Sequence, residues 1–140
     1  MFVLDTNVLA ELMRPMPAPG VIRWVDAQEP ATLFITAITV AELLYGIARL
    51  PDDKRKTGLL ELGTAMLRED FAGRILPFDE VAATCYADLV CERQAAGSPV
   101  SMADAQIAAI CRTLGATLAT RNVKDFHGTR LDLFNPWADL

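Results

Sequence analysis

The chain alternates short apolar runs with longer stretches of helical character, and this alternation limits the possible folds more than any other feature. Short apolar runs bounded by Pro, Gly or polar residues are typical of buried strands. The predicted strands cover residues 2–4, 32–35, 74–78 and 116–120, and residues 131–134 are a candidate fifth. The predicted helices cover residues 8–13, 21–27, 40–50, 54–70, 79–96 and 102–114.

Strands that alternate with helices in this way form a parallel sheet with helices on both faces. We therefore predict an α/β fold with three layers, α/β/α, around a central, mostly parallel sheet of four to five strands. No linker or internal repeat divides the 140 residues, and 52% of them are hydrophobic, which is ample for one core. Residues 1–140 are expected to form a single domain.

The N-terminal segment does not resemble a signal peptide, because Asp5 and Glu11 interrupt the apolar stretch that such a peptide needs. Other apolar stretches are too short to cross a bilayer, so a cytoplasmic location is expected. The formal net charge of −5 argues against broad, unspecific binding of nucleic acid. It leaves open a nuclease whose acidic residues surround a metal ion.

The cysteines and the histidine offer little catalytic chemistry. Cys85, Cys91 and Cys111 form no CxxC pair and no zinc-binding spacing, so reduced, buried thiols are expected. The single histidine, His127, cannot build a histidine metal site and is expected in a loop. With one histidine, no nucleophilic Ser or Cys constellation is available, and hydrolysis would need a metal-activated water.

Four acids stand where ligands gather in open α/β sheets, near the carboxyl ends of strands. Asp5 ends the first predicted strand, and Glu42 follows the second within FITAITVAELL. Asp125 follows the fourth strand, and Asp104 opens the helix that leads into that strand.

Each acid also has a purely structural interpretation. Thr39 and Ser101 stand three residues before Glu42 and Asp104, which is the spacing of a capping box. The other two acids could likewise cap a helix or form an Asx-turn.

The surroundings of these acids favour a metal site. Glu42 is the single charge in residues 38–47, and Asp104 is the single charge in residues 102–111, so both helices are predicted to be buried. Burying ionised carboxylates without partners costs several kcal/mol, and several acids together repel one another. A divalent cation would remove both costs, and oxygen ligands select Mg²⁺, with Mn²⁺ as a substitute.

Five motifs in order carry a resemblance to a known family: LDTN at the N-terminus, then AITVAEL, ADAQIAA, ATRNVKDF and FNPW. The chain resembles PIN-domain ribonucleases, and more narrowly the VapC type, the toxin half of bacterial toxin–antitoxin pairs. The resemblance implies Mg²⁺-dependent endonucleolytic cleavage of RNA, a homodimer, and inhibition by a VapB-like antitoxin whose C-terminal segment lies over the site.

The resemblance also assigns residues. The metal-binding acids of the family fall on Asp5, Glu42 and Asp104, and the fourth acidic position falls on Asp125 or on Asn122. Supporting hydrogen bonds are expected from four residues: Thr6, Asn7, Thr120 and Asn122.

From the residues themselves we expect Asp5 and Asp104 to bind the metal directly. Glu42 and Asp125 would complete the charge cluster, one of them positioning or deprotonating water. Arg121 is a candidate RNA phosphate contact, and so is the basic tract at 54–56, whose alternative is a solvated helix start. The apolar residues of 40–50 and 59–70 are expected to form an antitoxin groove, a dimer face or ordinary core.

Two alternatives remain open at this stage. One is a catalytically weak PIN-fold scaffold that binds other proteins. The other is an acid-based phosphatase or phospho-receiver of another α/β family. The phosphatase motif DxDxT is incomplete here, because Thr6 and Asn7 follow Asp5, and the adjacent acidic pair of a receiver is absent.

Overall fold

The structure, a computed structural model that describes residues 1–138, is built on a five-stranded, all-parallel sheet with the strand order β3-β2-β1-β4-β5. β1 is the central strand and pairs with β2 through Phe2 and Leu33, and with β4 through Phe2 and Thr117. The strands are β1 (Phe2–Leu4), β2 (Leu33–Thr36), β3 (Ile75–Leu76), β4 (Thr117–Ala119) and β5 (Asp132–Phe134). The predicted parallel sheet is confirmed.

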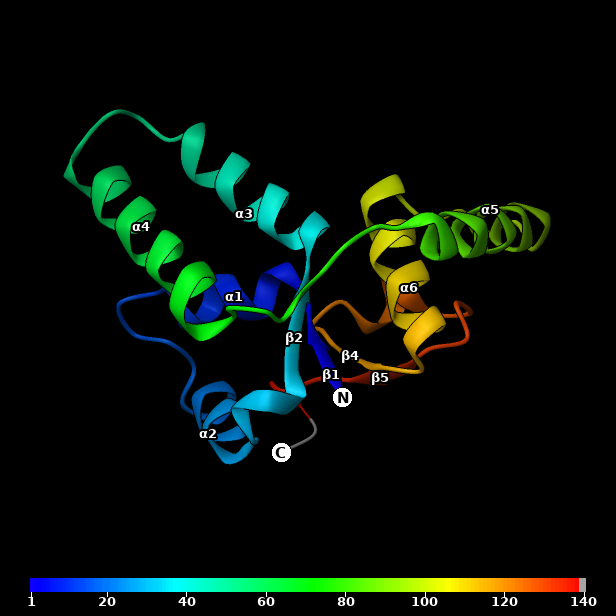
Figure 1. Ribbon diagram of the computed structural model, residues 1–140, viewed down its shortest axis with the longest axis horizontal. Helices are drawn as coiled ribbons and strands as arrows, with labels where there is room; N and C mark the ends of the chain where they lie inside the picture. The colour runs from blue at the N-terminus through cyan, green and yellow to red at the C-terminus, as the bar shows by residue number, and fades with distance from the viewer. Residues whose placement is uncertain (139–140) are drawn as a thin grey trace.

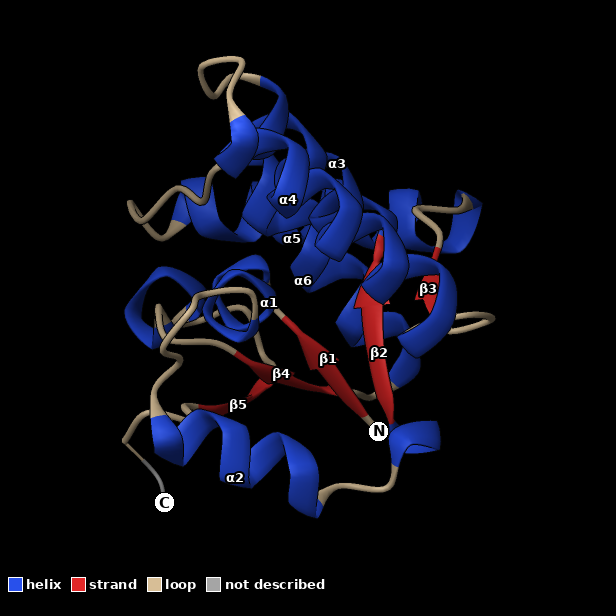
Figure 2. Cartoon of the chain, turned by 90° about the vertical axis from the view of Figure 1, so that its left-hand side faces the viewer, coloured by secondary structure: helices blue, strands red, loops and turns tan. Residues whose placement is uncertain are grey.

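Helices cover both faces of this sheet. In Figure 1 the helices of the first half of the chain lie on one side of it, and α5 and α6 lie on the other. Figure 2 shows the sheet from another side, with α2 running along its lower part. The helices are α1 (Thr6–Leu12), α2 (Pro19–Ala27), α3 (Ala37–Ala48), α4 (Lys54–Ala65), α5 (Glu80–Ala95) and α6 (Met102–Leu114). The predicted three-layer α/β/α architecture is confirmed.

The core is divided in two by the sheet. Successive strand residues point to opposite faces, so Leu4 packs among α1 to α4 while its neighbour Val3 packs against α6. Both side chains are fully buried. The short central strand is therefore apolar at every position because it faces helices on both sides.

The start of α3 differs from the sequence prediction. The helix begins at Ala37, because the Thr36 hydroxyl accepts a hydrogen bond from the Thr39 backbone N–H at 3.1 Å and caps the helix. The predicted capping box between Thr39 and Glu42 is wrong, and Glu42 lies in the second turn. The N-cap of α6 at Ser101 agrees with the spacing in the sequence, and the structure also has Asp79 as the N-cap of α5 and Gly115 as the C-cap of α6.

The predicted helix 54–70 is interrupted in its last part. It consists of α4 and a five-residue π-helical segment, Met66–Asp70. Two short 3₁₀ helices, Pro30–Thr32 and Val123–Phe126, were not predicted. The second of these carries Asp125, one of the four predicted site acids.

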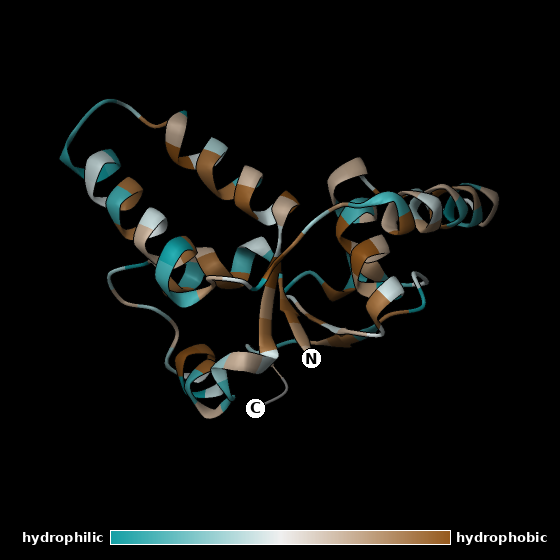
Figure 3. Ribbon diagram, viewed as in Figure 1, coloured by the Kyte–Doolittle hydropathy of each residue, from teal (hydrophilic) through white to brown (hydrophobic). Residues whose placement is uncertain are grey.

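The two apolar helices that carry acids differ in burial. α6 is buried as predicted, with six buried residues between Ala105 and Cys111. The prediction for α3 is wrong: its buried residues are Thr39, Leu43 and Ile47, and Tyr45 is 68% exposed. In Figure 3, α3 is nevertheless largely apolar along its length. Part of the apolar side-chain surface of α3 therefore lies on the outside of the molecule.

All three cysteines are free, but only Cys111 is buried, so the expectation of buried thiols is wrong for the exposed Cys91 and the half-buried Cys85. No helix within residues 1–138 has the length and apolar character needed to span a bilayer.

Candidate active site

Asp5 lies at the centre of the site, at the carboxyl end of the central strand β1. Its backbone N–H donates to the Ala119 carbonyl at 2.9 Å, which ties it to the end of β4. Its side chain is 4% exposed and caps α1 by accepting a hydrogen bond from the Thr6 N–H at 2.8 Å. The predicted cap at Asp5 is confirmed, and the capping contact uses Oδ1, leaving Oδ2 for other partners.

Two side chains donate to that second oxygen. The Thr120 hydroxyl donates to Oδ2 of Asp5 at 2.7 Å, and the Asn7 amide donates to it at 3.3 Å. Burial raises the pKa of Asp5, the charge of Glu42 raises it further, and the hydrogen bonds from these donors oppose the rise. No cation pairs with Asp5 among the described residues.

A small network of hydrogen bonds connects the end of β4 to the start of α1. The Asn7 side chain accepts a hydrogen bond from the Arg121 N–H at 3.2 Å, and the Thr120 hydroxyl accepts one from the Asn122 N–H at 3.0 Å. The structure thus brings Thr6, Asn7 and Thr120 to Asp5. Asn122 contributes through its backbone, and its side chain is exposed.

Glu42 reaches the site from α3 and is held by Thr6, whose hydroxyl donates to Glu42 Oε1 at 2.7 Å. The Thr6 hydroxyl also lies 3.2 Å from that of Thr39, which in turn lies 3.4 Å from the buried hydroxyl of Thr36. The sequence did not predict this chain of threonine hydroxyls. The one local signal for it is the pair of threonines in the TAIT segment that surrounds the start of α3.

Asp104 lies in the first turn of α6, half-buried, with its backbone N–H donating to the Ser101 hydroxyl at 3.2 Å. Burial raises the pKa of Asp104 to about 6. The negative charge of Asp5 contributes next, the Ser101 hydroxyl opposes the rise, and the charges of Glu42 and Asp125 add to it. All four predicted acids therefore lie close enough to influence one proton.

Asp125 lies on the 3₁₀ helix Val123–Phe126 and lines one recess together with Asp104. The buried ring of Phe126 anchors this segment against α6. The Asp125 carboxylate accepts no hydrogen bond from the residues that the structure describes, so the Asx-turn is not formed. Of the two residues proposed for the fourth acidic position, Asp125 is the one that faces Asp104.

The donor set fits a hard divalent cation held with few protein ligands. It contains carboxylate and hydroxyl oxygens, and none of the four acids forms an ion pair within the described part of the chain. Over the same residues, no three Asp, Glu, His or Cys side chains are close enough together to hold a metal ion. Mg²⁺ commonly binds one or two carboxylates and keeps several waters, so an open site of this kind suits it.

Two basic groups proposed to contact RNA have other partners. The Arg121 guanidinium lies 5.1 Å from the centre of the Trp137 ring, a cation–π contact beside the site. In the tract at 54–56, Lys56 is held by the Asp52 carboxylate at 2.8 Å and the Ala48 carbonyl at 2.9 Å, so it has a structural role. Phosphate contact by Arg121 stays a prediction.

Two buried polar side chains near the site were not assigned any role from the sequence. Glu11 is 4% exposed, pairs with Arg14 at 3.3 Å and accepts from the Ala18 N–H at 3.0 Å, which fixes the segment after α1. Burial and the nearby charge of Asp5 raise the pKa of Cys111 to about 12, so its thiol is neutral beneath the site.

The chain belongs to the PIN-domain family, because the family model of the PIN domain matches residues 2–129. Parallel strands with acids at their carboxyl ends are the arrangement that the sequence motifs led us to expect.

The relatives make the assignment narrower. The VapC ribonuclease Y4jK of Sinorhizobium fredii is 42% identical over 137 residues, covering 98% of each chain. The toxin FitB of Neisseria gonorrhoeae is 40% identical over 139 residues, covering 99% of this chain and 100% of FitB. The crystal structure of FitAcB from the same organism superposes with a TM-score of 0.92 at 40% identity, covering 99% of both chains. The resemblance to VapC-type proteins is confirmed.

Proposed function

We propose that the chain is a Mg²⁺-dependent endoribonuclease and the toxin component of a VapBC-type pair, acting as one domain through residues 1–140. One observation carries the proposal. Asp5 is buried and Asp104 half-buried at one edge of the sheet, and both have raised pKa values and no cationic partner within residues 1–138. Acids in this state are poised to bind a divalent cation.

Each residue of the site has a separate task. Asp5 and Asp104 would be the direct ligands, and the donors Thr6, Asn7 and Thr120 orient the Asp5 carboxylate and oppose the rise in its pKa. Thr6 also holds Glu42, which completes the ligand set or orients the attacking water. Asp125, exposed at the rim, is the second candidate for that water. When bound, Mg²⁺ supplies polarisation of the phosphate and a lower pKa for its bound water.

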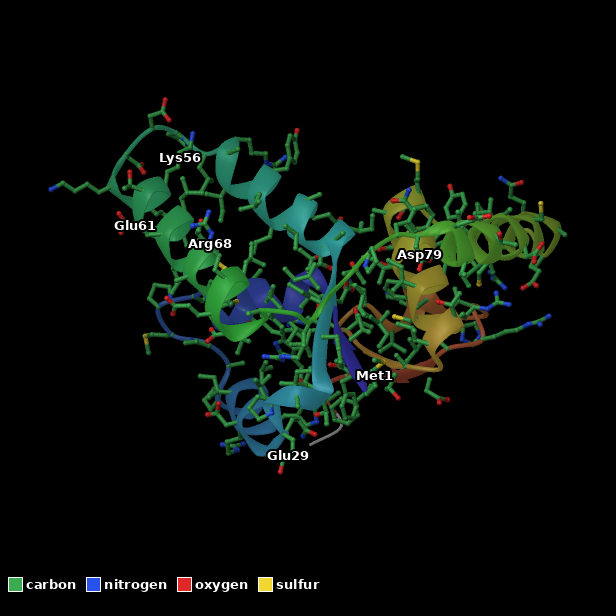
Figure 4. The ribbon with its side chains drawn as sticks, viewed as in Figure 1. Met1, Glu29, Lys56, Glu61, Arg68 and Asp79 are labelled. Atoms are coloured by element: carbon green, nitrogen blue, oxygen red, sulfur yellow. The ribbon has the colours of Figure 1, made fainter. Side chains whose placement is uncertain are left out.

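The partner would be a VapB-like antitoxin, and a groove between α1, α3 and α4 suits it. The groove has a volume of about 550 Å³ and is lined by apolar side chains such as Leu43, Ile47 and Leu59. Thr6 and Glu42 of the site are among its lining residues, so a segment seated in it would reach the acids. Figure 4 labels Lys56 and Glu61 on α4, which forms one wall of the groove. The groove is also lined by the basic residues Arg14, Lys54 and Arg55, so an apolar helix that carries acidic residues as well as a cationic end near Glu42 would match it.

We further propose a homodimer. The exposed apolar residues Val81 of α5 and Leu114 of α6 support it, since they are 64% and 47% exposed. Light scattering of the purified protein tests this part independently, and a monomer at all concentrations would contradict it.

The enzymatic part is tested by RNA cleavage with and without Mg²⁺. Cleavage should require the metal and should be lost in Asp5→Asn. Equal cleavage by this variant would mean a contaminating nuclease. Turnover of a small aryl phosphate would instead favour the phosphatase alternative, and antitoxin binding without any RNA cleavage would favour the scaffold.

A further inference from the structure

A second depression lies at the start of α6 and shares no lining residue with the groove between α3 and α4. It is a polar recess of about 360 Å³ between the connection 98–101, which leads into α6, and the segment 124–127. Asp104 and Asp125 are among the residues that line it. The remaining polar lining residues are Ser98, Ser101, Lys124 and His127.

The two basic residues of this recess project from the same side of one turn. The His127 N–H donates to the Lys124 carbonyl at 3.3 Å, which closes a 3₁₀-type turn, and side chains three residues apart on such a turn lie one above the other. Both side chains are exposed, and neither forms an ion pair or hydrogen bond with any residue that the structure describes. Two donors are therefore presented together, without partners, next to the acids.

The serine of the opposite wall is engaged with Asp104. Its hydroxyl oxygen accepts the Asp104 N–H at 3.2 Å, and its hydrogen bond to the Asp104 carboxyl opposes the rise in the pKa of that group. Lys124 and His127 thus offer an ammonium and an imidazole around one opening. Phosphate oxygens are the natural acceptors for such a set.

The two walls of the recess are joined by Arg93, near the end of α5. Its Nε donates to the Ser98 carbonyl at 3.2 Å, and its guanidinium also donates to the Gly128 carbonyl at 3.3 Å. Gly128 has a φ of +78°, and a Cβ built there would collide with the Arg93 guanidinium. The spacing of the walls therefore depends on a close approach that glycine permits.

We propose that this recess is a subsite for an RNA phosphate adjacent to the one that is cleaved, with Lys124 and His127 as its ligands. The proposal rests on the proposed ribonuclease function and extends it. The carboxylates of Asp104 and Asp125 would repel the phosphates of an RNA strand that crosses the recess. The two basic residues offset this repulsion. The subsite fixes the register of the strand, while the acids act on the neighbouring phosphate.

The test compares wild-type protein with Lys124→Ala/His127→Ala on RNA oligonucleotides that lengthen by one nucleotide at either end. In the wild type, one particular added phosphate should lower KM by about fivefold, and in the variant that step should disappear. kcat should not change. The slope of log KM against log salt concentration should fall by about 0.7, the value for one phosphate contact with a single strand.

Arg23→Ala is the matched control, since it removes one positive charge from the exposed surface of α2, outside the recess. It should leave both the length step and the salt slope unchanged. If the double variant keeps the wild-type length step and slope, the subsite is refuted while the ribonuclease function stands. A fall in kcat at unchanged KM also refutes it. Absence of cleavage by the wild type, in contrast, refutes the ribonuclease function itself.

Discussion

The Thr120 hydroxyl donates a 2.7 Å hydrogen bond to the Asp5 carboxylate across a sequence separation of 115 residues. Both side chains are buried, and they follow the adjacent strands β4 and β1. The contact is made possible by the parallel pairing of these strands, which brings their carboxyl ends to one edge of the sheet. A residue 115 positions further along the chain therefore opposes the rise that burial causes in the pKa of Asp5.

Replacing this donor should damage the site without removing an acid. In Thr120→Val the shape of the side chain is kept and the hydrogen bond to Asp5 is lost. The pKa of Asp5 should rise further, and the free energy of unfolding should fall by about 1–3 kcal/mol. RNA cleavage should fall about 10- to 100-fold, as for other residues that orient a metal ligand. Thr120→Ser should retain most activity, and Thr117→Val, in the same strand, controls for the strand itself. Equal activity of all three variants would contradict the role of Thr120.

The stability of the metal-free protein should depend on pH through Asp104. Its native pKa of about 6 lies above the ordinary value of 3.8, so the folded chain binds more protons than the unfolded chain between these values. The free energy of unfolding contributed by Asp104 should therefore decrease as the pH rises from about 4 to about 6. Thermal unfolding across this range, compared between wild type and Asp104→Asn, isolates the effect. Parallel curves for the two proteins would show that ionisation of Asp104 does not destabilise the folded protein.

A divalent cation should offset the loss of stability that ionised Asp104 causes near neutral pH. If Asp5 and Asp104 share one ion, Mg²⁺ or Mn²⁺ should raise the melting temperature by binding to the native state only. Asp104→Asn should abolish the rise. Asp52→Asn is the control, because this carboxylate is exposed and paired with Lys56 at a distance from the site. A rise that persists in Asp104→Asn would place the ion elsewhere.

The contact between Arg93 and Gly128 can be tested by alanine substitutions at Gly128 and at Gly73. Both have a positive φ, +78° and +73°, but a Cβ at Gly73 meets no atom within 4 Å. Alanine at either position should cost about 1–2 kcal/mol through backbone strain. Only Gly128→Ala should also displace Arg93 and raise KM for RNA. Adding Arg93→Ala to Gly128→Ala should then cause little further loss, and additive losses from the two changes would contradict a shared contact.

The parts of the site that the sequence predicted are those with local causes. Asp5 stands directly after an apolar strand and caps the next helix, and Asp104 stands in the first turn after Ser101. Strand ends and helix caps can be read within a few residues, so the placement of these two acids followed from the pattern. The sheet followed in the same way, because each strand is a short apolar run between helices.

The parts that were missed depend on contacts between distant segments. The bond from Thr6 to Glu42 joins residues 36 apart, and the contact of Arg93 with Gly128 joins residues 35 apart. The burial of α3 was wrongly predicted for a related reason. An apolar helix indicates that something covers it, but the pattern does not say whether the cover is the core of the same chain or another molecule.

The central position of β1 has a consequence for biosynthesis. Asp5 is made 115 residues before its partner Thr120, which directly follows β4. A nascent or truncated chain that stops before residue 117 lacks β4 and cannot complete the sheet around β1. The site around Asp5 can thus be completed only after β4 and Thr120 have left the ribosome.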